Sequence, residues 1–472
     1  MAERTFYNWS KQFHCTPQRV HEPRSETEII DIMAELSRRN AHMRVFGGGL
    51  SPGDIAMSNE ELILVTNFDR VLNIDVDAAT VVVQPRVTLA ALSHELASHG
   101  LALPVLGSVA EQTVAGAIGT GTHGTGLKFG TLSTLVEGMR LVTPNGDVLN
   151  ISAAENPELL NAVRCHLGSL GVITQVTLRV CRAFDLEATE RPNTLSTVLD
   201  SLPERLRRDH YRFWYIPHTD RVWEWSATRT PPEQTERLGP WRRLGTWFNG
   251  RIVDHHVYES LLHLATYRPS LIPNINKLGA RTRFSKPCYS MGPSFSQFTF
   301  DCLFKQHVNE WSIPIEHTAE ALRSIRELIT QKGYYAHLPI EVRFVGGDDI
   351  WLSPCQGRDS CYIGVIAYIP HARPHHHEAY FADFERLMAA FGGRPHWGKF
   401  FKFQATELAR RYPQRIFDRS DDIWIRVIGY GTHSRTECFE HSVRKSGSYF
   451  CIEPSWNGHS GKSRWGWPRG CW

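Results

Sequence analysis

The stretch TVAGAIGTGTHGTG at residues 113–126 contains five glycines, four threonines and one histidine. Within it, Gly119, Gly121 and Gly124 satisfy the spacing G-x-G-x-x-G. A Rossmann site for a dinucleotide requires this spacing at the start of a helix, with an acidic residue about 20 positions further on. Here the glycines continue into a loop, and Glu137 comes too early. We therefore interpret the stretch as a close-approach surface for a flat, polyphosphorylated cofactor outside the Rossmann class, in preference to a structural loop.

A second glycine-rich turn lies upstream, in RVFGGGLSP at residues 44–52. A predicted strand runs into Gly47–Gly49, whose backbone N–H groups carry no side chains that would hinder a pyrophosphate. A plain glycine-rich turn explains this pattern equally well. The same residues satisfy G-x-S-x-G, the nucleophile elbow of α/β-hydrolases. That mechanism needs the backbone N–H that follows Ser51, and Pro52 has none, so the hydrolase interpretation is excluded.

Two short segments in the C-terminal half of the chain carry candidate catalytic side chains. In PIEVRF, a predicted strand places Glu341 and Arg343 on one face. An exposed ion pair is the simpler interpretation of these two residues, and a paired acid and base in a site is the alternative. In RPHWGK, His396 and Lys399 follow two glycines. A basic surface loop and a site explain that segment about equally well.

The histidine run His375–His377, together with His371, is a weak candidate for a metal site. Adjacent side chains diverge, and no cysteine or aspartate pattern with the spacing of metal ligands accompanies them. We therefore predict a solvated loop before a helix and no metal site.

Hydrophobic periodicity divides the chain into two α+β regions and a tail. Helices are predicted over residues 26–39, 89–99, 259–267, 315–333 and 379–390. Strands are predicted over residues 42–46, 62–66, 71–75, 80–84, 172–180, 212–217, 222–227, 339–345 and 361–368, with a hairpin over 139–151 that turns at Asn145–Gly146. The pattern of apolar residues changes near residue 184, and hydrophobic periodicity disappears after residue 417. The predicted units are therefore residues 17–183, 184–417 and 418–472.

Composition excludes several classes of protein. The chain has 472 residues, of which 42% are hydrophobic and 21% charged, with a net charge of +3. This is globular composition, and the small net charge gives nucleic-acid binding no support. The ten cysteines include no CxxC pair, which favours reduced thiols in an intracellular protein. No signal peptide or long apolar run is present. We expect a cytoplasmic protein, or one attached peripherally to an organelle membrane, without an obligate protein partner.

Six segments together resemble the sugar-1,4-lactone oxidases, the family of L-gulonolactone oxidase and D-arabinono-1,4-lactone oxidase. They are RVFGGGLSPGDIA, GSVAEQTVAGAIGTGTHGTGLKFG, HLGSLGVITQVTL, FKQHVNEWSIP, PIEVRFVGGDDIWLSPC and FGGRPHWGK. Members are flavoproteins of the vanillyl-alcohol-oxidase type with a PCMH-type FAD-binding domain. The resemblance implies an α+β fold, in which a two-part FAD-binding domain at residues 17–183 precedes an α+β cap domain that carries the substrate site.

The resemblance also implies which residues bind FAD. Gly47, Gly48, Gly49 and Ser51 would hold the pyrophosphate, and Gly168 to Val172 would contact the adenine side. The ribityl chain and isoalloxazine would lie along Gly107, Thr113, Gly116, Gly119, Thr120, Gly121, Thr122, His123 and Gly124.

At one position this chain has a different residue from many members of the family. Where this chain has Leu50, those relatives have a histidine that is bonded covalently to the 8α-methyl carbon of the flavin. Leucine has no nucleophilic atom, so we expect FAD to bind noncovalently, as in related galactonolactone dehydrogenases.

The implied reaction is oxidation of an aldono-1,4-lactone at C2, with O2 reduced to hydrogen peroxide. Glu341 would orient the C2 hydroxyl or accept its proton. Arg343 would stabilise negative charge on the reduced flavin. Lys399 would hydrogen-bond near the reacting atoms, and His396 would shape the pocket. The product is a 2-keto lactone that leads to ascorbate or its five-carbon analogue.

Three alternatives stay open at this point. The protein is a lactone dehydrogenase if another electron acceptor replaces O2. It is a polyol oxidase if the Glu-x-Arg and HWGK segments, which that group shares, serve a sugar alcohol. It is an inactive flavin-binding paralogue if the atypical tail at residues 418–472 abolishes its enzymatic activity.

Overall fold

A small parallel sheet covered by one helix begins the fold. The computed structural model describes residues 4–232, 257–300, 305–369 and 376–412. The sheet has the order β3-β5-β4, and its elements are β3 (Arg19–His21), α1 (Glu26–Arg38), β4 (Met43–Phe46) and β5 (Glu61–Leu64). Helix α1 begins after Ser25, whose side chain accepts a hydrogen bond from the backbone N–H of Glu28. The predicted helix over residues 26–39 is confirmed within one residue.

The second sheet is antiparallel and has the order β10-β9-β11-β7-β6. Its strands are β6 (Val71–Asp75), β7 (Thr80–Val83), β9 (Val136–Val142), β10 (Val148–Ser152) and β11 (Val172–Arg179). The predicted hairpin over residues 139–151 is confirmed, because β9 and β10 pair and Gly146 adopts a φ of +89° in the turn. Helices α2 (Leu89–Ser98) and α3 (Val114–Gly119) share a hydrophobic core with this sheet.

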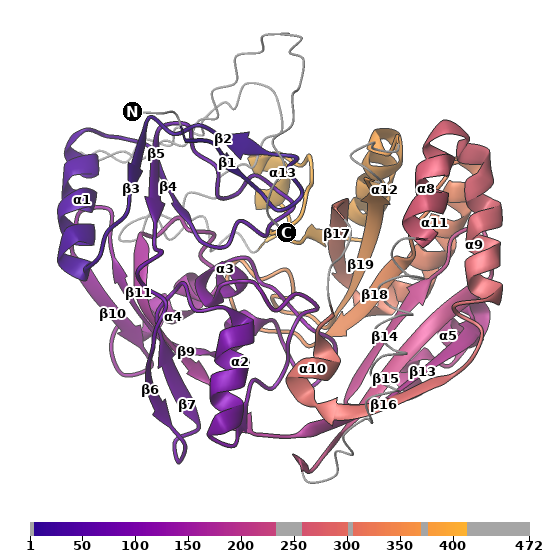
Figure 1. Cartoon of the computed structure of the whole chain (residues 1–472), viewed down its shortest axis with the longest axis horizontal. Helices are drawn as coiled ribbons and strands as arrows, with labels where there is room; N and C mark the ends of the chain where they lie inside the picture. Colours follow the sequence, from indigo (N-terminus) through magenta and orange to yellow (C-terminus); the bar gives the residue numbers. More distant parts are fainter. Residues whose placement is uncertain (1–3, 233–256, 301–304, 370–375, 413–472) are drawn as a thin grey trace.

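The C-terminal half is built on an eight-stranded antiparallel sheet, visible on the right of Figure 1. Its order is β16-β13-β15-β14-β18-β19-β17-β20. The strands are β13 (Asp185–Thr194), β14 (His210–Tyr215), β15 (Arg221–Thr230), β16 (Cys288–Pro293), β17 (Gln306–Pro314), β18 (Ile340–Val345), β19 (Ser360–Tyr368) and β20 (Arg394–Pro395). The strands predicted at residues 212–217, 222–227, 339–345 and 361–368 are confirmed. Strands β13, β16 and β17 were not predicted.

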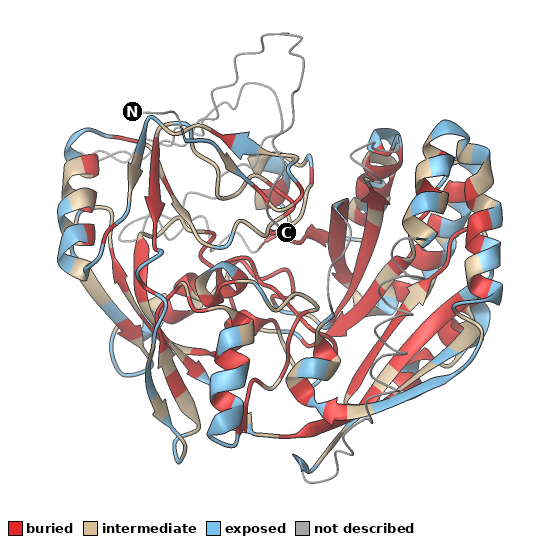
Figure 2. Cartoon of the chain, viewed as in Figure 1, coloured by how far each residue is buried: buried red, intermediate tan, exposed pale blue. Residues whose placement is uncertain are grey.

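Helices cover one face of this large sheet and leave the other face for the N-terminal half (Figure 1). The covering helices are α5 (Leu195–Asp200), α11 (Thr318–Lys332) and α12 (Glu378–Ala390). Val342 and Phe344 of β18 point into the core beneath these helices. Because side chains alternate along a strand, Glu341 and Arg343 point to the opposite face. Figure 2 shows that the central strands of the sheet are nevertheless buried.

Shorter strands and further helices complete the two halves. They are β1 (Phe6–Tyr7), β2 (His14–Cys15), β8 (Leu101–Ala102), α4 (Leu160–Val163), β12 (Cys181–Arg182), α6 (Leu202–Arg205), α8 (Tyr258–Tyr267), α9 (Ile272–Arg281), α10 (Ser294–Phe298) and α13 (Ala405–Ala409). The division predicted at residue 184 falls between β12, which pairs with β8, and β13, which belongs to the large sheet. Leu408 and Tyr412 pack in one cluster with Cys165 and Leu167, so the C-terminal segment returns to the N-terminal half. The predicted tail at residues 418–472 lies outside the described residues.

Candidate active site

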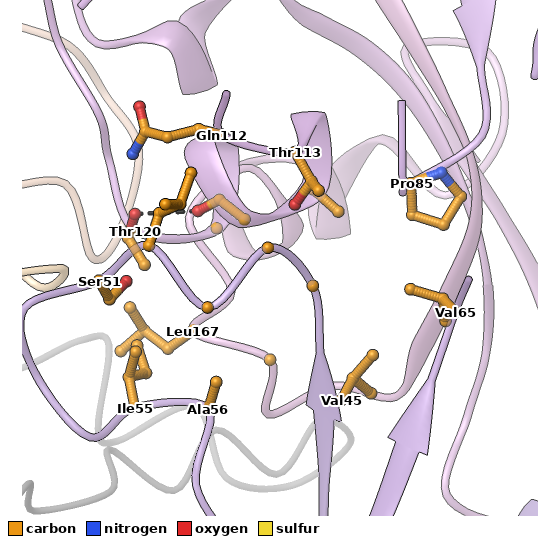
Figure 3. A pocket seen from close by; sticks show the side chains of 18 of the residues that line it. Val45, Ser51, Ile55, Ala56, Val65, Pro85, Gln112, Thr113, Thr120 and Leu167 are labelled. Carbon is orange, nitrogen blue, oxygen red and sulfur yellow. Dashed lines mark hydrogen bonds between the residues drawn. The ribbon is translucent and has the colours of Figure 1, made fainter. Parts of the chain in front are cut away.

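Two pockets adjoin, the first within the N-terminal half and the second between that half and the large sheet. The first is lined by the glycine turn that follows β4 and by the segment around α3, and Figure 3 shows Val45, Ser51, Thr113 and Thr120 around it. The second lies against the open face of the large sheet. Residues that line both pockets are Leu50, Ser51, Gln112 and Thr120. The two pockets therefore form one continuous site.

Close approach of backbone segments explains the glycines of the first pocket. A Cβ atom on Gly47 would lie 2.8 Å from Thr113 Oγ1, and one on Gly116 would lie 2.9 Å from the same atom. Contacts this short do not occur between real atoms of these types, so a side chain at either glycine would have to displace the side chain of Thr113. The glycines leave backbone exposed in part of the wall of the first pocket.

Unpaired donors in the first pocket fit an anionic cofactor. The backbone N–H groups of Gly48, Gly49 and Leu50 have no acceptor among the described residues. His166 Nδ1 accepts a hydrogen bond from the N–H of Gly168 at 2.8 Å, so its proton lies on Nε2, which is buried without a partner. Burial lowers the pKa of His166 to about 4 and keeps the ring neutral. A pyrophosphate and the polar edges of FAD would satisfy such donors.

Most of the predicted cofactor residues line these pockets. In the first pocket lie Gly47, Gly48, Gly49, Leu50, Ser51, Thr113, Gly116, Gly119, Thr120 and Gly168. In the second lie Gly107, Thr122 and His123. His166 is a lining residue that sequence reasoning missed, although the segment HLGSLG begins with it.

Three predicted cofactor residues line neither pocket. The side chain of Val172 packs in the core with α1, and its neighbour Ile173 lines the first pocket instead. Gly124 is needed for packing, because a Cβ there would lie 2.5 Å from the carbonyl oxygen of Leu106. Gly121 provides a turn with a φ of +66°. Contact of these three residues with the cofactor stays a prediction.

The four predicted catalytic residues, Glu341, Arg343, His396 and Lys399, all line the second pocket. Arg343 Nη2 donates to Glu341 Oε1 at 2.7 Å, and a second bond joins Arg343 to the hydroxyl of Ser108. The simpler interpretation, an exposed ion pair, is wrong because the side chain of Arg343 is only 6% exposed. The N-terminal half covers this face of the sheet and makes the pair part of a pocket.

A second cation, Arg212, helps Arg343 to keep the carboxylate of Glu341 ionised. Burial alone would raise the pKa of Glu341, but Arg343 and Arg212 hold it below its ordinary value. Burial and the nearby Arg343 in turn lower the pKa of Arg212 to about 10, so this guanidinium stays charged at neutral pH. Trp214 Nε1 donates to Glu341 Oε1 at 3.3 Å. The carboxylate is thus held ionised and oriented, with Oε2 unpaired among the described residues.

Glu310 is the functional candidate that sequence reasoning missed. It lies on β17 and lines the second pocket, and its side chain is 7% exposed. Its Oε1 lies 3.3 Å from His123 Nε2, and its Oε2 lies 3.5 Å from Lys399 Nζ. Burial would raise the pKa of Glu310, yet Lys399 and His123 hold it well below its ordinary value. The only signal in the sequence was an acid within the otherwise strand-like segment HVNEWSIP.

A hydrogen bond and ring stacking hold His123 in this cluster. His123 Nδ1 lies 3.0 Å from the carbonyl oxygen of Gly124, which can only accept, so Nδ1 carries a proton. His123 Nε2 faces Glu310, and the ring of Tyr362 stacks on the imidazole with 3.6 Å between the ring centroids. Glu310 is therefore an anion between the ammonium of Lys399 and the ring of His123.

The same cluster has the spacing of a metal site, because ligand atoms of His123, Glu310 and His396 lie within 4.8 Å of one another. The hydrogen bonds argue against that use. His396 Nδ1 accepts a hydrogen bond from the N–H of Gly398 at 3.0 Å, so its proton lies on Nε2 and no lone pair remains. Burial lowers the pKa of His396 to about 3, so the ring is neutral. We interpret the cluster as a hydrogen-bonded charge network.

Family models match both halves of the chain. One described as D-arabinono-1,4-lactone oxidase matches residues 176–419, and one described as FAD binding domain matches residues 17–152. Among curated proteins, L-gulonolactone oxidase of Scyliorhinus torazame is 37% identical, over 86% of this chain and 92% of that protein. L-gulono-1,4-lactone dehydrogenase of Mycobacterium tuberculosis is 34% identical over the same shares. D-arabinono-1,4-lactone oxidase of Candida glabrata is 28% identical, over 84% of each.

Solved structures with a similar fold include cholesterol oxidases. The enzyme from Brevibacterium sterolicum aligns with a TM-score of 0.66 and 16% identity, over 85% of this chain and 87% of that chain. A solvent-stable cholesterol oxidase aligns with a TM-score of 0.68 and 17% identity, over 84% and 87%. At such low identity, this likeness shows the fold alone, and it is the family model over residues 17–152 that identifies the FAD-binding domain.

Proposed function

Since this chain belongs to the sugar-1,4-lactone oxidase family and is an FAD-dependent oxidoreductase, we propose that it oxidises L-gulono-1,4-lactone at C2 and passes the electrons to O2. Oxidation of an aldonolactone follows from the family. The choice of the six-carbon lactone rests on the greater identity to an L-gulonolactone oxidase of Bos taurus, 38%, than to a D-arabinono-1,4-lactone oxidase of Candida glabrata, 28%.

The observation that carries this proposal is the continuity of the two pockets. The first offers unpaired backbone donors, and the second offers the carboxylates of Glu310 and Glu341 beside the cations of Arg343 and Lys399. A cofactor whose phosphates lie in the first pocket can reach the second only past Leu50, Ser51, Gln112 and Thr120. The charged side chains are therefore placed where the reacting end of an extended cofactor would meet a polyhydroxylated substrate.

The side chains of the second pocket supply the acid and base chemistry. Bound FAD would accept the hydrogen of C2 together with its bonding electrons. Glu341 accepts the proton of the C2 hydroxyl through its unpaired Oε2, so that the C2–O bond becomes a carbonyl. Arg343 and Lys399 stabilise the negative charge that develops during this step. His396 and His123 form the pocket wall beside Lys399.

Flavin reduction tests the function directly. We expect L-gulono-1,4-lactone, added without oxygen, to bleach the absorbance of the FAD-loaded protein, and we expect hydrogen peroxide once air is admitted. Bleaching without peroxide would favour a dehydrogenase that uses another acceptor. Bleaching by a sugar alcohol in place of a lactone would favour a polyol oxidase, and FAD binding without any bleaching would contradict the proposal.

We also propose that FAD is bound noncovalently, because Leu50, at the junction of the two pockets, has no nucleophilic atom. The flavin colour is expected to pass completely into the supernatant when the purified protein is precipitated with acid. Flavin fluorescence that stays with the protein on a denaturing gel would contradict this prediction and require another attachment residue.

No helix in the described part of the chain is long and apolar enough to cross a membrane. Location in the cell and peripheral membrane attachment stay predictions from the sequence.

A further inference from the structure

Strands β1 and β2 and the loop between them, the N-terminal hairpin, are bonded to the glycine turn of the first pocket. The backbone N–H of Trp9 donates to the carbonyl oxygen of Gly49 at 2.8 Å. The side-chain amide of Asn8 donates to the carbonyl oxygen of Ser51 at 3.1 Å and to that of Pro52 at 3.3 Å. Three carbonyl groups of the turn are therefore held by two consecutive residues of the hairpin.

These bonds also fix the direction of N–H groups in the turn. The peptide bonds are trans, and in a trans peptide unit the C=O of one residue and the N–H of the next point to opposite sides. With the carbonyl of Gly49 held by Trp9, the N–H of Leu50 points away from Trp9. The carbonyl of Pro52 fixes the N–H of Gly53 in the same way. Leu50 and Gly53 line the first pocket, and neither N–H has an acceptor among the described residues.

The side chain of Asn8 has no hydrogen bond left to offer a ligand. Asn8 is 2% exposed and lines the first pocket. A primary amide has two donor hydrogens and two lone pairs on its oxygen. Nδ2 donates to the two carbonyls of the turn, and Oδ1 accepts from the N–H of Phe13 at 3.1 Å and from the hydroxyl of Ser10 at 3.3 Å. Asn8 can therefore act on a cofactor through the turn, as a positioning residue.

The N-terminal hairpin is also attached to the C-terminal half. His307 Nδ1 of β17 donates to Gln12 Oε1 at 2.6 Å, and the ring of Phe13 stacks on that of Phe400 with 6.2 Å between centroids. Trp9 lines the second pocket. The hairpin thus links the glycine turn to the other half of the molecule, beside the site.

We propose that Asn8 is a cofactor-positioning residue, which holds the carbonyl groups of the glycine turn so that the N–H groups of Leu50 and Gly53 bind the pyrophosphate of FAD. The N-terminal hairpin is then part of the cofactor site, although the family model of the FAD-binding domain begins only at residue 17. This role concerns FAD binding alone. It does not depend on which substrate is oxidised or on which acceptor takes the electrons.

Release of FAD from the holoenzyme tests this role. We expect Asn8→Ala to release FAD about tenfold faster than the wild type, because a misdirected N–H weakens a hydrogen bond to a charged group. Flavin fluorescence measures the release. The ³¹P resonances of bound FAD are expected to shift in the variant, since they report the surroundings of the pyrophosphate. These resonances decide the test alone if the flavin proves to be attached covalently.

Asn276→Ala is the matched control for the loss of a buried asparagine. Asn276 lies on α9 and is 4% exposed, and its amide likewise donates to two carbonyl oxygens, those of Pro217 and Ala336, both at 3.1 Å. The thermal unfolding temperature is expected to fall by similar amounts in Asn276→Ala and Asn8→Ala. The rate of FAD release and the ³¹P resonances of Asn276→Ala are expected to match the wild type.

Two further variants separate the turn from the hairpin. Ser10→Ala removes a hydrogen bond to Asn8 Oδ1 but none to the turn, so its FAD release is expected to match the wild type. Asn8→Ser keeps one donor hydrogen and is expected to release FAD at a rate between those of the wild type and Asn8→Ala. It carries the test if the alanine variant does not fold.

The inference is overturned if Asn8→Ala releases FAD no faster than Asn276→Ala, because Asn8 would then serve the stability of the fold alone. Faster release with unchanged ³¹P resonances would also overturn it, since the effect would not act at the pyrophosphate. Faster release with shifted resonances supports it whether or not gulonolactone is oxidised. Failure of gulonolactone to bleach the flavin would contradict only the proposed function.

Discussion

Replacing Arg343 with methionine is expected to lower kcat for the lactone about 100- to 1,000-fold, with FAD content unchanged. Loss of one preorganised group that stabilises developing charge costs this much in other enzymes. Arg343 is buried, and it bonds Glu341 and Ser108 through one guanidinium nitrogen. Methionine fills much of the same volume without supplying the charge, so the loss falls on the reaction more than on the fold.

The same substitution is expected to change the pH dependence. Arg343 is the strongest of the charges that hold the pKa of Glu341 down against the effect of burial. Without Arg343, the pKa of Glu341 rises, and the carboxylate becomes protonated at a higher pH as the solution is acidified. The acid limb of the kcat/KM profile is therefore expected to move to higher pH.

Stopped-flow measurement of flavin reduction against pH tests both effects. Arg343→Lys keeps the charge and is expected to recover part of the rate, although lysine cannot reproduce the planar fork. Arg323→Met is the matched control, because Arg323 is exposed and lies 4.0 Å from Asp200 in a surface ion pair. If the rate of flavin reduction in the Arg343→Met variant is within threefold of the wild-type rate, the role assigned to Arg343 is wrong.

Local patterns predicted those parts of the fold whose structure is set locally. Helix α1 has an N-cap at Ser25 and a regular apolar stripe, and the hairpin β9–β10 has an Asn-Gly turn. Strand β17 was missed because seven of its nine residues are buried, on both faces of the sheet. No alternation of polar and apolar residues survives in such a strand. The order of the eight strands could not be predicted either, because pairing between distant strands is decided by tertiary packing.

The candidate site was predictable where the relevant residues are close in sequence. Glu341 and Arg343 share a face because they are two positions apart on one strand. Their burial depends on the N-terminal half, which the sequence of the strand does not reveal. Glu310 joins them only through the register of β17 and β19, and His166 through the fold of the first pocket. The resemblance to a family likewise did not distinguish glycines that line the site, such as Gly119, from Gly124, which is required by packing.

Replacing Glu310 with glutamine is expected to reduce the free energy of unfolding by about 3–5 kcal/mol at neutral pH, the cost of breaking a buried ion pair by removing one partner. Glu310 lies 3.3 Å from the ring of His123 and 3.5 Å from the ammonium of Lys399. Once Glu310 is neutral, the ammonium of Lys399 has lost its anionic partner in the pocket. Chemical unfolding of the FAD-loaded protein measures this loss.

Glu35→Gln is the matched control for exposure. Glu35 pairs with Arg19 and Arg39 at 3.3 Å, similar to the distances at Glu310, but its side chain is 44% exposed. Exposed pairs contribute about 0–1 kcal/mol, so this variant is expected to stay near wild-type stability. The double variant Glu310→Gln with Lys399→Met is expected to regain part of the loss, because it also removes the cation that was left without an anionic partner. Equal stability of Glu310→Gln and Glu35→Gln would contradict the charge network.

The pH dependence of this loss of stability distinguishes the loss of an ion pair from a packing defect. The pKa of Glu310 in the folded protein lies well below the 4.5 of an unperturbed glutamate, because Lys399 and His123 outweigh burial. Its contribution to stability is therefore fully present above about pH 4.5 and is lost as the pH falls through the folded pKa. Glu310→Gln has no group to titrate at this site. The stability difference between wild type and variant must consequently shrink on acidification, whereas a packing defect alone would leave it constant.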